Sequence, residues 1–269
     1  MEIQSKRVEI MPAKRRAMIL DRLRRDGAAS ILELSEEIGA SASTIRRDLE
    51  QLTEGGYLER THGGALLVPP LRATFEHEPS LNAELQHPQK RAIGALAALR
   101  VNPGESVIFD MGSTVLEAVR ATAERQIPLT AVTNSIEAAR LCAECPSWRV
   151  IVPGGTVRPG LQMMVGEPGV SFFGTIHADV CLVGAYAITG RILTDASLEV
   201  AALKRAMIGA ARRAILLIDS TKFRAPSFSA FCDISAISEV ITDDGADAED
   251  LAALRAQNIK VTVATTQPA

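Results

Sequence analysis

Apolar residues in three stretches near the beginning of the chain recur at the spacing of amphipathic helices. The stretches cover 14–25, 31–38 and 42–54, and in each the apolar residues lie three or four positions apart, which places them on one side of a helix. The positions expected to face a shared core are Met18, Ile19 and Leu23, then Ile31, Leu34 and Ile38, then Ile45, Leu49 and Leu52. Three short helices with apolar faces predict a small helical domain.

Small polar residues and glycines mark the boundaries of the third helix. Ser41 is expected to cap its N-terminus, because the hydroxyl can accept a hydrogen bond from a first-turn backbone N–H. Gly55 and Gly56 are expected to end it, since glycine tolerates the left-handed conformation found after helices. Gly39 and Ala40 form the tight turn to the preceding helix. Two helices joined in this way predict a helix-turn-helix.

A small wing is expected after the third helix. Tyr57 and Leu58 begin a strand, and the His-Gly-Gly sequence at 62–64 forms a turn. The strand and its return make a two-stranded wing, so residues 12–67 are interpreted as a winged helix-turn-helix DNA-binding domain. In such a motif the N-terminal residues of the recognition helix enter the major groove. The expected DNA-contacting residues are Ser43, Thr44, Arg46, Arg47, Arg60, His62 and Gly63.

The two adjacent arginines of the third helix leave one question open. Arg46 and Arg47 suit either guanine edges or DNA phosphates, and the sequence does not decide between them. An amphipathic helix alone is common in any globular protein. Three helices and a wing in this order favour DNA binding.

Beyond a proline-containing linker at 68–89, the pattern changes to short apolar strands alternating with helices. This alternation predicts a Rossmann-like α/β domain over 90–265 with a mainly parallel sheet covered on both faces. Strands are expected at 107–110, 129–134, 149–152, 180–184, 214–219, 240–242 and 260–263. Helices are expected at 89–100, 114–121, 135–142, 198–211 and 248–257.

Polar residues gather where these strands end, which is where ligands of parallel sheets bind. A glycine and hydroxyls before a helix also favour an anion, because backbone N–H groups and the helix dipole point at it. The polar strand ends suggest a pocket for a small phosphorylated polyol. The residues expected there are Asp110, Gly112, Ser113, Thr114, Asn134, Ser135, Gly154, Gly155, Glu199, Lys204 and Lys222, with Gly184, Asp195 and Asp219 nearby.

The chain resembles the DeoR/GlpR family of bacterial transcription regulators. The matching blocks in the first domain are Thr-Ile-Arg-Arg-Asp-Leu at 44–49, Glu-Arg at 59–60 and His-Gly-Gly-Ala at 62–65. In the second domain they are Asp-x-Gly-Ser-Thr at 110–114, Val-Thr-Asn-Ser at 132–135, Gly-Gly at 154–155 and Asp-Ser-x-Lys-Phe at 219–223. The resemblance covers roughly 14–265.

The family resemblance implies a role for each residue at the strand ends. It implies an effector domain, similar to sugar-phosphate isomerases, that senses a phosphorylated sugar. Ser113, Thr114, Asn134 and Ser135 would hold phosphate or hydroxyls; Lys204 and Lys222 would be cationic partners; Asp110 and Glu199 would accept sugar hydroxyls. From the residues alone, Asp110 equally suits a helix cap, Lys204 a solvated helix face, and Glu199 a favourable charge at a helix start.

Composition adds two constraints. The chain has 269 residues with 47% hydrophobic and 23% charged residues, and its net charge is −3. No apolar run reaches the roughly 18 residues needed to span a bilayer, and Glu2, Lys6 and Arg7 interrupt the start of the chain, so a soluble cytoplasmic protein is expected. Between 14 and 65 there are 9 basic and 9 acidic residues. The DNA-binding domain is therefore neutral overall, and its positive charge is local.

No cofactor or metal site is expected. Cys142 and Cys145 have the spacing of a metal-binding pair, but no second pair lies at ligand spacing, so reduced, buried thiols are favoured. The histidines other than His62, at 77, 87 and 177, are too scattered to form a site.

The leading hypothesis is a sequence-specific transcriptional regulator without catalytic residues. It would be a repressor of a carbohydrate or polyol catabolic operon, would bind double-stranded operator DNA as a homodimer or homotetramer, and would respond to a phosphorylated sugar or polyol. The alternative is a sugar-phosphate isomerase with an added DNA-binding domain, in which Asp110, Asp195 or Glu199 is the base and Lys204 the electrophile.

Overall fold

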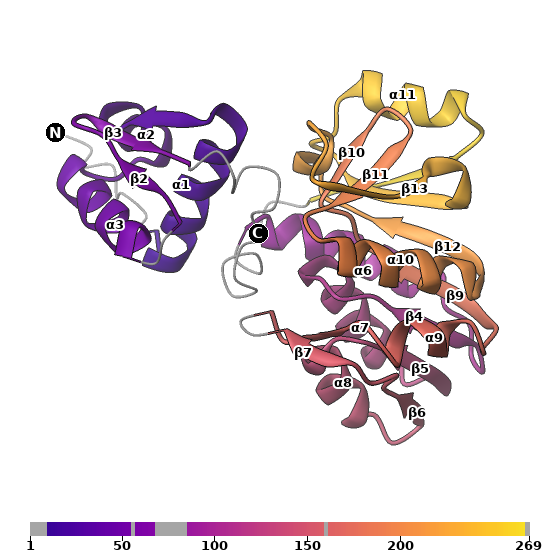
Figure 1. The fold of residues 1–269 in the computed structure, drawn as a ribbon. Helices are drawn as coiled ribbons and strands as arrows, with labels where there is room; N and C mark the ends of the chain where they lie inside the picture. Colours follow the sequence, from indigo (N-terminus) through magenta and orange to yellow (C-terminus); the bar gives the residue numbers. More distant parts are fainter. Residues whose placement is uncertain (1–9, 55–56, 68–84, 159–160, 267–269) are drawn as a thin grey trace, which may run out of the picture. The chain divides into compact units, whose positions relative to one another are not determined.

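The computed structural model describes residues 10–54, 57–67, 85–158 and 161–266. The chain forms two compact units, 1–85 and 86–269, which are treated one at a time (Figure 1). The expected helix stop at Gly55 and Gly56 lies outside the described residues. Most of the expected linker (68–89) also lies outside them, and a helix begins at His87, within the last residues of that range.

The smaller unit is a winged helix-turn-helix, as predicted. A three-stranded antiparallel sheet in the order β1-β3-β2 accompanies three helices, where the sequence predicted only a two-stranded wing. The third strand was missed because it is a three-residue Ala-Ala-Ser segment with no strand-like pattern. The elements are α1 (Pro12–Asp26), β1 (Ala28–Ser30), α2 (Ile31–Ile38), α3 (Ala42–Glu54), β2 (Glu59–Arg60) and β3 (Gly64–Leu66).

The core of this unit is built from the expected helix faces. Eight of the nine predicted core positions are buried, while Met18 is half-buried and packs at the margin of the core. Ser41 caps α3 as predicted, since its Oγ accepts a hydrogen bond from the backbone N–H of Thr44 at 3.2 Å. Ser30 caps α2 in the same manner, and Glu33 bonds back to the N–H of Ser30. These caps hold the beginnings of both helices of the motif.

The larger unit is built on a seven-stranded parallel sheet. Its spatial order is β15-β14-β12-β9-β4-β5-β6, so in chain order the strands run 3-2-1-4-5-6-7 from the β6 edge. All seven strands were predicted to within a few residues. They are β4 (Ser106–Phe109), β5 (Leu129–Thr133), β6 (Trp148–Ile151), β9 (Ala178–Val183), β12 (Ala211–Leu217), β14 (Glu239–Asp243) and β15 (Lys260–Ala264).

Helices cover both faces of this sheet (Figure 1). Along β4, Val107 and Phe109 face a core shared with α6, α7 and α8, while Ile108 faces the core shared with α9, α10 and α11. The predicted Rossmann-like architecture is therefore confirmed. The helices are α6 (His87–Ala98), α7 (Ser113–Glu124), α8 (Ile136–Ala143), α9 (Gly169–Phe173), α10 (Leu198–Gly209) and α11 (Ala248–Ala256).

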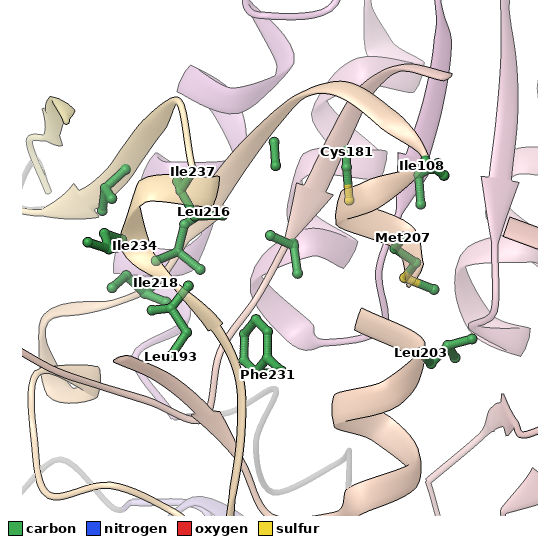
Figure 2. Close-up of a cluster of buried hydrophobic side chains, with 14 of the residues drawn as sticks. Ile108, Cys181, Leu193, Leu203, Met207, Leu216, Ile218, Phe231, Ile234 and Ile237 are labelled. Atoms are coloured by element: carbon green, nitrogen blue, oxygen red, sulfur yellow. The ribbon is translucent and has the colours of Figure 1, made fainter. Parts of the chain in front are cut away.

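Two small antiparallel sheets and two short 3₁₀ turns were not predicted. The hairpin β7–β8 precedes α9, and β10-β11-β13 forms a sheet next to α10. Figure 2 shows how this second sheet joins the main core: Leu193 and Phe231 lie in one apolar cluster with Leu203 and Met207 of α10. The elements are β7 (Thr156–Arg158), β8 (Met163–Val165), β10 (Ala187–Thr189), β11 (Ile192–Asp195), β13 (Ser229–Asp233), η1 (Ser220–Lys222) and η2 (Ile234–Ala236).

The helices in the described part of the chain were also compared with the length and hydropathy of membrane spans. None of them is both long enough and apolar enough to cross a membrane.

Candidate functional site

The order of the strands singles out one position on the sheet. The chain runs outward from β4 through β5 to β6, then returns to place β9 on the other side of β4. Helical connections on the two sides therefore diverge at the carboxyl ends of β4 and β9, the point at which open α/β sheets bind ligands. Asp110 follows β4 there, and Gly184 follows β9.

A buried group of three charged residues occupies this position. Lys204 Nζ of α10 lies 3.2 Å from Asp110 Oδ2 and 2.8 Å from Asp195 Oδ2. It also donates to the carbonyl oxygen of Gly184 at 2.9 Å, and the N–H of Gly184 donates to Asp110 Oδ2 at 3.0 Å. The Phe231 ring lies 5.4 Å from Nζ, close enough for a cation–π contact. Asp110, Asp195 and Lys204 are named the triad below.

The triad carries one more negative than positive charge when both carboxyls are ionised. Burial raises the pKa of the Asp110 carboxyl by more than the Lys204 ammonium and the Gly184 N–H lower it. Burial by itself would lower the pKa of Lys204, but the two carboxylates outweigh that effect and the pKa lies above its ordinary value. Lys204 therefore stays protonated, and the excess negative charge of the triad is carried by the carboxylates.

Asn134, at the end of the neighbouring strand β5, holds the hairpin against the sheet. Its Nδ2 donates to the carbonyl oxygen of Met164 at 3.2 Å, and the Met164 N–H donates to the Asn134 carbonyl oxygen at 2.9 Å. Met163 and Val165 of β8 are buried against Val200 of α10. The hairpin and α10 thus form an apolar cover near the polar strand ends.

The helices that follow β4 and β5 differ at their N-termini. Ser135 caps α8, because its Oγ accepts from the N–H of Ala138 at 3.2 Å. Gly112 occupies the corresponding position before α7 with φ of 132°, and no side chain caps that helix. Ser113 and Thr114 form its first turn. No capping side chain therefore occupies the α7 N-terminus, the kind of position that attracts anions, while Ser135 occupies that of α8.

In the smaller unit, the exposed side of α3 carries the two arginines. Arg46 and Arg47 are exposed and form no ion pair or hydrogen bond with the described residues. Ser43 is exposed and Thr44 half-buried near the start of the same helix. Both arginine side chains are free to contact DNA.

The other described arginines of this unit are mostly held by acidic residues. Arg15 of α1 forms a two-pronged ion pair with Asp48 of α3, and its remaining nitrogen donates to the carbonyl oxygen of Ile10 at 2.9 Å. Arg22 pairs with Glu37 at 2.8 Å. Asp48 and Glu37 thus neutralise arginines that hold the fold, whereas Arg46 and Arg47 have no ion-pair partner among the described residues.

The wing has one glycine fixed by packing and one at an open position. A Cβ on Gly64 would lie 2.1 Å from the carbonyl oxygen of Ala29 in β1, whereas a Cβ on Gly63 would meet no atom within 4 Å. His62 and Gly63 are exposed at the tip. Arg60 is exposed too, and it pairs with Glu50 of α3 at 3.0 Å, which links the wing to the recognition helix.

Comparison with known families now decides the identity of the chain. Residues 15–70 match the family model described as "DeoR-like helix-turn-helix domain", and residues 85–244 match "DeoR C terminal sensor domain". The chain belongs to the DeoR family.

Relatives of this DeoR-family chain extend over nearly its whole length. The HTH-type transcriptional regulator GlpR of Haloferax volcanii is 30% identical over 94% of this chain and 98% of its own. The transcriptional repressor AccR of Agrobacterium fabrum is 30% identical over 86% of this chain and 89% of its own. The L-fucose operon activator of Haemophilus influenzae is 30% identical over 84% and 90%.

The family membership settles the class of protein. DeoR-family proteins of this kind are DNA-binding transcriptional regulators, so this chain is a regulator and the isomerase alternative falls. Among solved structures, ribose 5-phosphate isomerase A of Methanocaldococcus jannaschii matches 50% of this chain and 53% of its own with a TM-score of 0.38 and 15% identity. That likeness is too weak to assign a role to any residue.

Not all residues expected in the effector site of this DeoR-family protein lie together. Glu199 is exposed in the first turn of α10, and Lys222 is half-buried at the end of η1; neither forms an ion pair with the described residues. Gly155 is required by packing, since a Cβ there would lie 2.7 Å from the carbonyl oxygen of Val165. Gly154 has φ of 86°, in the left-handed region that favours glycine. Both glycines of the 154–155 pair thus have structural reasons to be there.

Sequence reasoning left Asp195 and Gly184 out of the effector residues. Gly184 contributes through its backbone, which no side-chain pattern reveals. Asp195 ends β11, a strand of the unpredicted antiparallel sheet, so the rule for parallel strand ends did not apply to it. The available signal was the position of Asp195 directly before the helix that carries Lys204, which had placed it near the expected residues.

The four cysteines are free thiols, of which Cys142 and Cys181 are buried and Cys145 and Cys232 half-buried. Burial raises the pKa of the Cys142 and Cys232 thiols to about 12, and it raises the pKa of the Cys181 thiol well above its ordinary value. Within the described parts of the chain, no group of three or more potential ligand side chains could hold a metal ion.

Proposed function

We propose that this regulator represses a carbohydrate or polyol catabolic operon and that a phosphorylated sugar or polyol controls its binding to DNA. The observation that carries the proposal is the buried triad at the switch point of the sheet, beside an uncapped helix N-terminus. Burying the excess negative charge of the triad costs free energy, and a polar ligand that bonds the carboxylates would offset that cost. In this proposal the domain at residues 12–67 binds DNA, the linker at 68–89 joins the two domains, and the domain at 90–265 senses the effector.

The DNA-binding surface would be the exposed side of α3 together with the wing tip. Ser43, Thr44, Arg46 and Arg47 would enter the major groove, with the arginines on guanine edges or phosphates. Arg60, His62 and Gly63 would approach the adjacent backbone, where the open space around Gly63 allows close contact. Because paired half-sites are read by paired domains, a homodimer or homotetramer would bind operator DNA in the cytoplasm.

The effector's phosphate would bind at the α7 N-terminus. Gly112, Ser113 and Thr114 lie there without a capping side chain, and helix N-termini attract anions. The triad is a poor site for phosphate because of its excess negative charge, so it would contact hydroxyls. Lys222, whose ammonium is unpaired among the described residues, would be a second cation, and Ser135, Gly154, Gly155 and Glu199 would border the ligand.

Effector binding would change operator affinity only if the two conformations of the protein bind the effector differently. Such coupling is typically about 1–3 kcal/mol, or about 5- to 150-fold in affinity. Lys204 is suited to transmit it, because it joins the ends of β4, β9 and β11.

Binding of the full-length protein to the DNA upstream of its own gene, titrated with sugar and polyol phosphates, tests the proposal. We expect a specific complex that one phosphate dissociates at least about fivefold more readily than inorganic phosphate does. A specific complex that no ligand alters would refute the effector assignment. Absence of a specific complex would refute the operator assignment for that DNA and require selection of binding sites from random sequence.

A further inference from the structure

Two buried oxygen atoms at the switch point accept no hydrogen bond from the described residues. They are Asp110 Oδ1 and Asn134 Oδ1, and both residues are only 2% exposed. Buried acceptors are nearly always paired in native proteins, so an unpaired one indicates a missing partner such as a ligand or water. Here two occur on neighbouring strands of one sheet.

The register of the sheet places these residues side by side. Phe109 of β4 pairs with Thr133 of β5 in the parallel ladder, and Asp110 and Asn134 are the next residues along each strand. Adjacent parallel strands lie about 4.8 Å apart, and residues at the same level point to the same side of the sheet. The side chains that carry the two free acceptors therefore lie next to each other at the carboxyl ends of β4 and β5, on the same side of the sheet.

The hydrogen bonds already made fix both free atoms as acceptors. Asn134 must direct its NH₂ group at the Met164 carbonyl oxygen, 3.2 Å away, because a carbonyl can only accept. Its Oδ1 therefore points elsewhere. The other oxygen of Asp110 is occupied by the Gly184 N–H and the Lys204 ammonium. The missing partner must therefore supply two hydrogen-bond donors, and these must lie no farther apart than two neighbouring strands do, about 4.8 Å.

We infer that the effector presents a vicinal diol to these two atoms, one hydroxyl to Asp110 Oδ1 and the next to Asn134 Oδ1. The inference rests on the proposed function and names the chemistry of its ligand. A phosphate group, which offers acceptors at neutral pH, does not suit two acceptors next to an excess negative charge. The diol and the phosphate therefore occupy different parts of the site, the phosphate at α7. The apolar cover formed by Met163 and Val200 shields these hydrogen bonds from water.

Calorimetric titration of the full-length protein with linear alditol phosphates tests this inference. The probes are glycerol 3-phosphate, erythritol 4-phosphate, xylitol 5-phosphate and glucitol 6-phosphate, each with its monodeoxy analogues, and inorganic phosphate. For the tightest probe, removal of either hydroxyl of one vicinal pair should weaken binding about 100-fold, because a site built for a hydroxyl discriminates strongly against its absence. Removal of a hydroxyl elsewhere should weaken it less than about threefold.

Variants of Asn134 separate hydroxyl recognition from a structural role. Asn134→Ala removes the acceptor and the bond to Met164, whereas Asn134→Asp loses that bond but keeps an acceptor oxygen. The deoxy penalty, the ratio of the two dissociation constants, should fall to about threefold in Asn134→Ala and persist in Asn134→Asp. A penalty unchanged in Asn134→Ala overturns the inference. If Asn134→Ala does not fold, Asp110→Asn, which keeps shape but removes the charge of the acceptor, should lower the penalty about tenfold, and an unchanged penalty there is equally decisive.

The outcomes distinguish this inference from the function on which it rests. A phosphate that dissociates the DNA complex but binds with the same affinity after every deoxygenation supports the proposed function and overturns the diol assignment. Failure of every phosphate to bind overturns both.

Discussion

Asp48 of the recognition helix is held by Arg15, a residue 33 positions earlier in the chain. The guanidinium of Arg15 bonds both carboxylate oxygens of Asp48, whose side chain is only 3% exposed. A two-pronged ion pair fixes direction as well as distance. The angle at which α3 presents its arginines is therefore set in part by α1.

Breaking this pair should loosen the DNA-binding domain. Arg15→Met should leave Asp48 buried and unpaired and lower the local stability of α1 and α3 by about 3 kcal/mol, or about a hundredfold in amide exchange. The double variant Arg15→Met/Asp48→Leu should lose less, because no charge remains buried alone. Hydrogen exchange measured by mass spectrometry on the full chain would test this; a double variant less stable than the single one would contradict it.

Arg47→Ala should weaken operator binding at least tenfold without changing stability. Arg47 is exposed and forms no bond with the described residues, so its loss removes only contacts to DNA. Electrophoretic mobility shift with operator and with unrelated DNA measures the effect. A loss confined to operator DNA indicates a guanine contact, and an equal loss on both indicates a phosphate contact. Unchanged affinity would exclude Arg47 from the interface. Glu124→Gln, an exposed change on α7, is the control.

Substitutions of Lys204 and of Asp110 in the triad should differ strongly in their cost to stability. Lys204→Met leaves two buried carboxylates without a cation and should cost about 3–5 kcal/mol. Asp110→Asn keeps the shape and removes the excess negative charge, so the stability should change by less than about 1 kcal/mol while effector binding is weakened. Urea unfolding at neutral pH provides both values. Equal losses in the two variants would show that the excess charge carries no cost.

Stability should fall in acid where Glu239 becomes protonated. Burial raises the pKa of this carboxyl, but the hydrogen bonds from Arg100, Thr262 and Lys260 lower it by more. The pKa therefore lies below its ordinary value of 4.5. A carboxyl with a lowered pKa stabilises the folded state above about pH 4.5, and that contribution is lost as the pH falls through the folded-state pKa. Glu239→Gln should cost about 2 kcal/mol at pH 7, where the bonds to Arg100 are charged.

The difference between wild type and Glu239→Gln should shrink steadily below about pH 4.5. Denaturant titrations across pH 3 to 7 measure it. Glu124→Gln, at an exposed position on α7, serves as the control. A constant difference at every pH would show that the charge of Glu239 contributes nothing.

Gly64→Ala should separate the wing from β1, because the new Cβ would lie 2.1 Å from the Ala29 carbonyl oxygen. We expect a loss of about 2 kcal/mol in local stability, seen as faster amide exchange at 28–30 and 64–66, together with weaker operator binding. Gly63→Ala meets no atom and should leave exchange unchanged. Equal exchange in the two variants would refute the steric argument.

The sequence predicted the regular elements well because their apolar residues repeat clearly. The strands of the main sheet are short apolar runs, such as the Val-Ile-Phe of β4, flanked by glycine and polar residues. The hairpin β7–β8, the sheet β10-β11-β13 and the five-residue α9 were missed because segments of three to five residues carry no readable period.

The candidate site was predictable only in part. That Asp110 and Asn134 end neighbouring strands follows from alternation along the chain, so they could be placed at one edge. That Lys204 bonds both Asp110 and Asp195 depends on how α10 is turned and on an antiparallel strand, neither of which local sequence specifies. The same holds for Arg15 and Asp48, whose contact arises only from tertiary packing.

The pairing of arginines with carboxylates in the smaller unit affects how the protein searches for its operator. Each lysine or arginine that binds a phosphate releases condensed cations from DNA and adds sequence-independent affinity. Arg15 and Arg22 are committed to Asp48 and Glu37, so they displace no such cations. Random chromosomal DNA, which outnumbers the operator by about a millionfold or more, then competes less for the protein, and the time spent on incorrect sites is shorter.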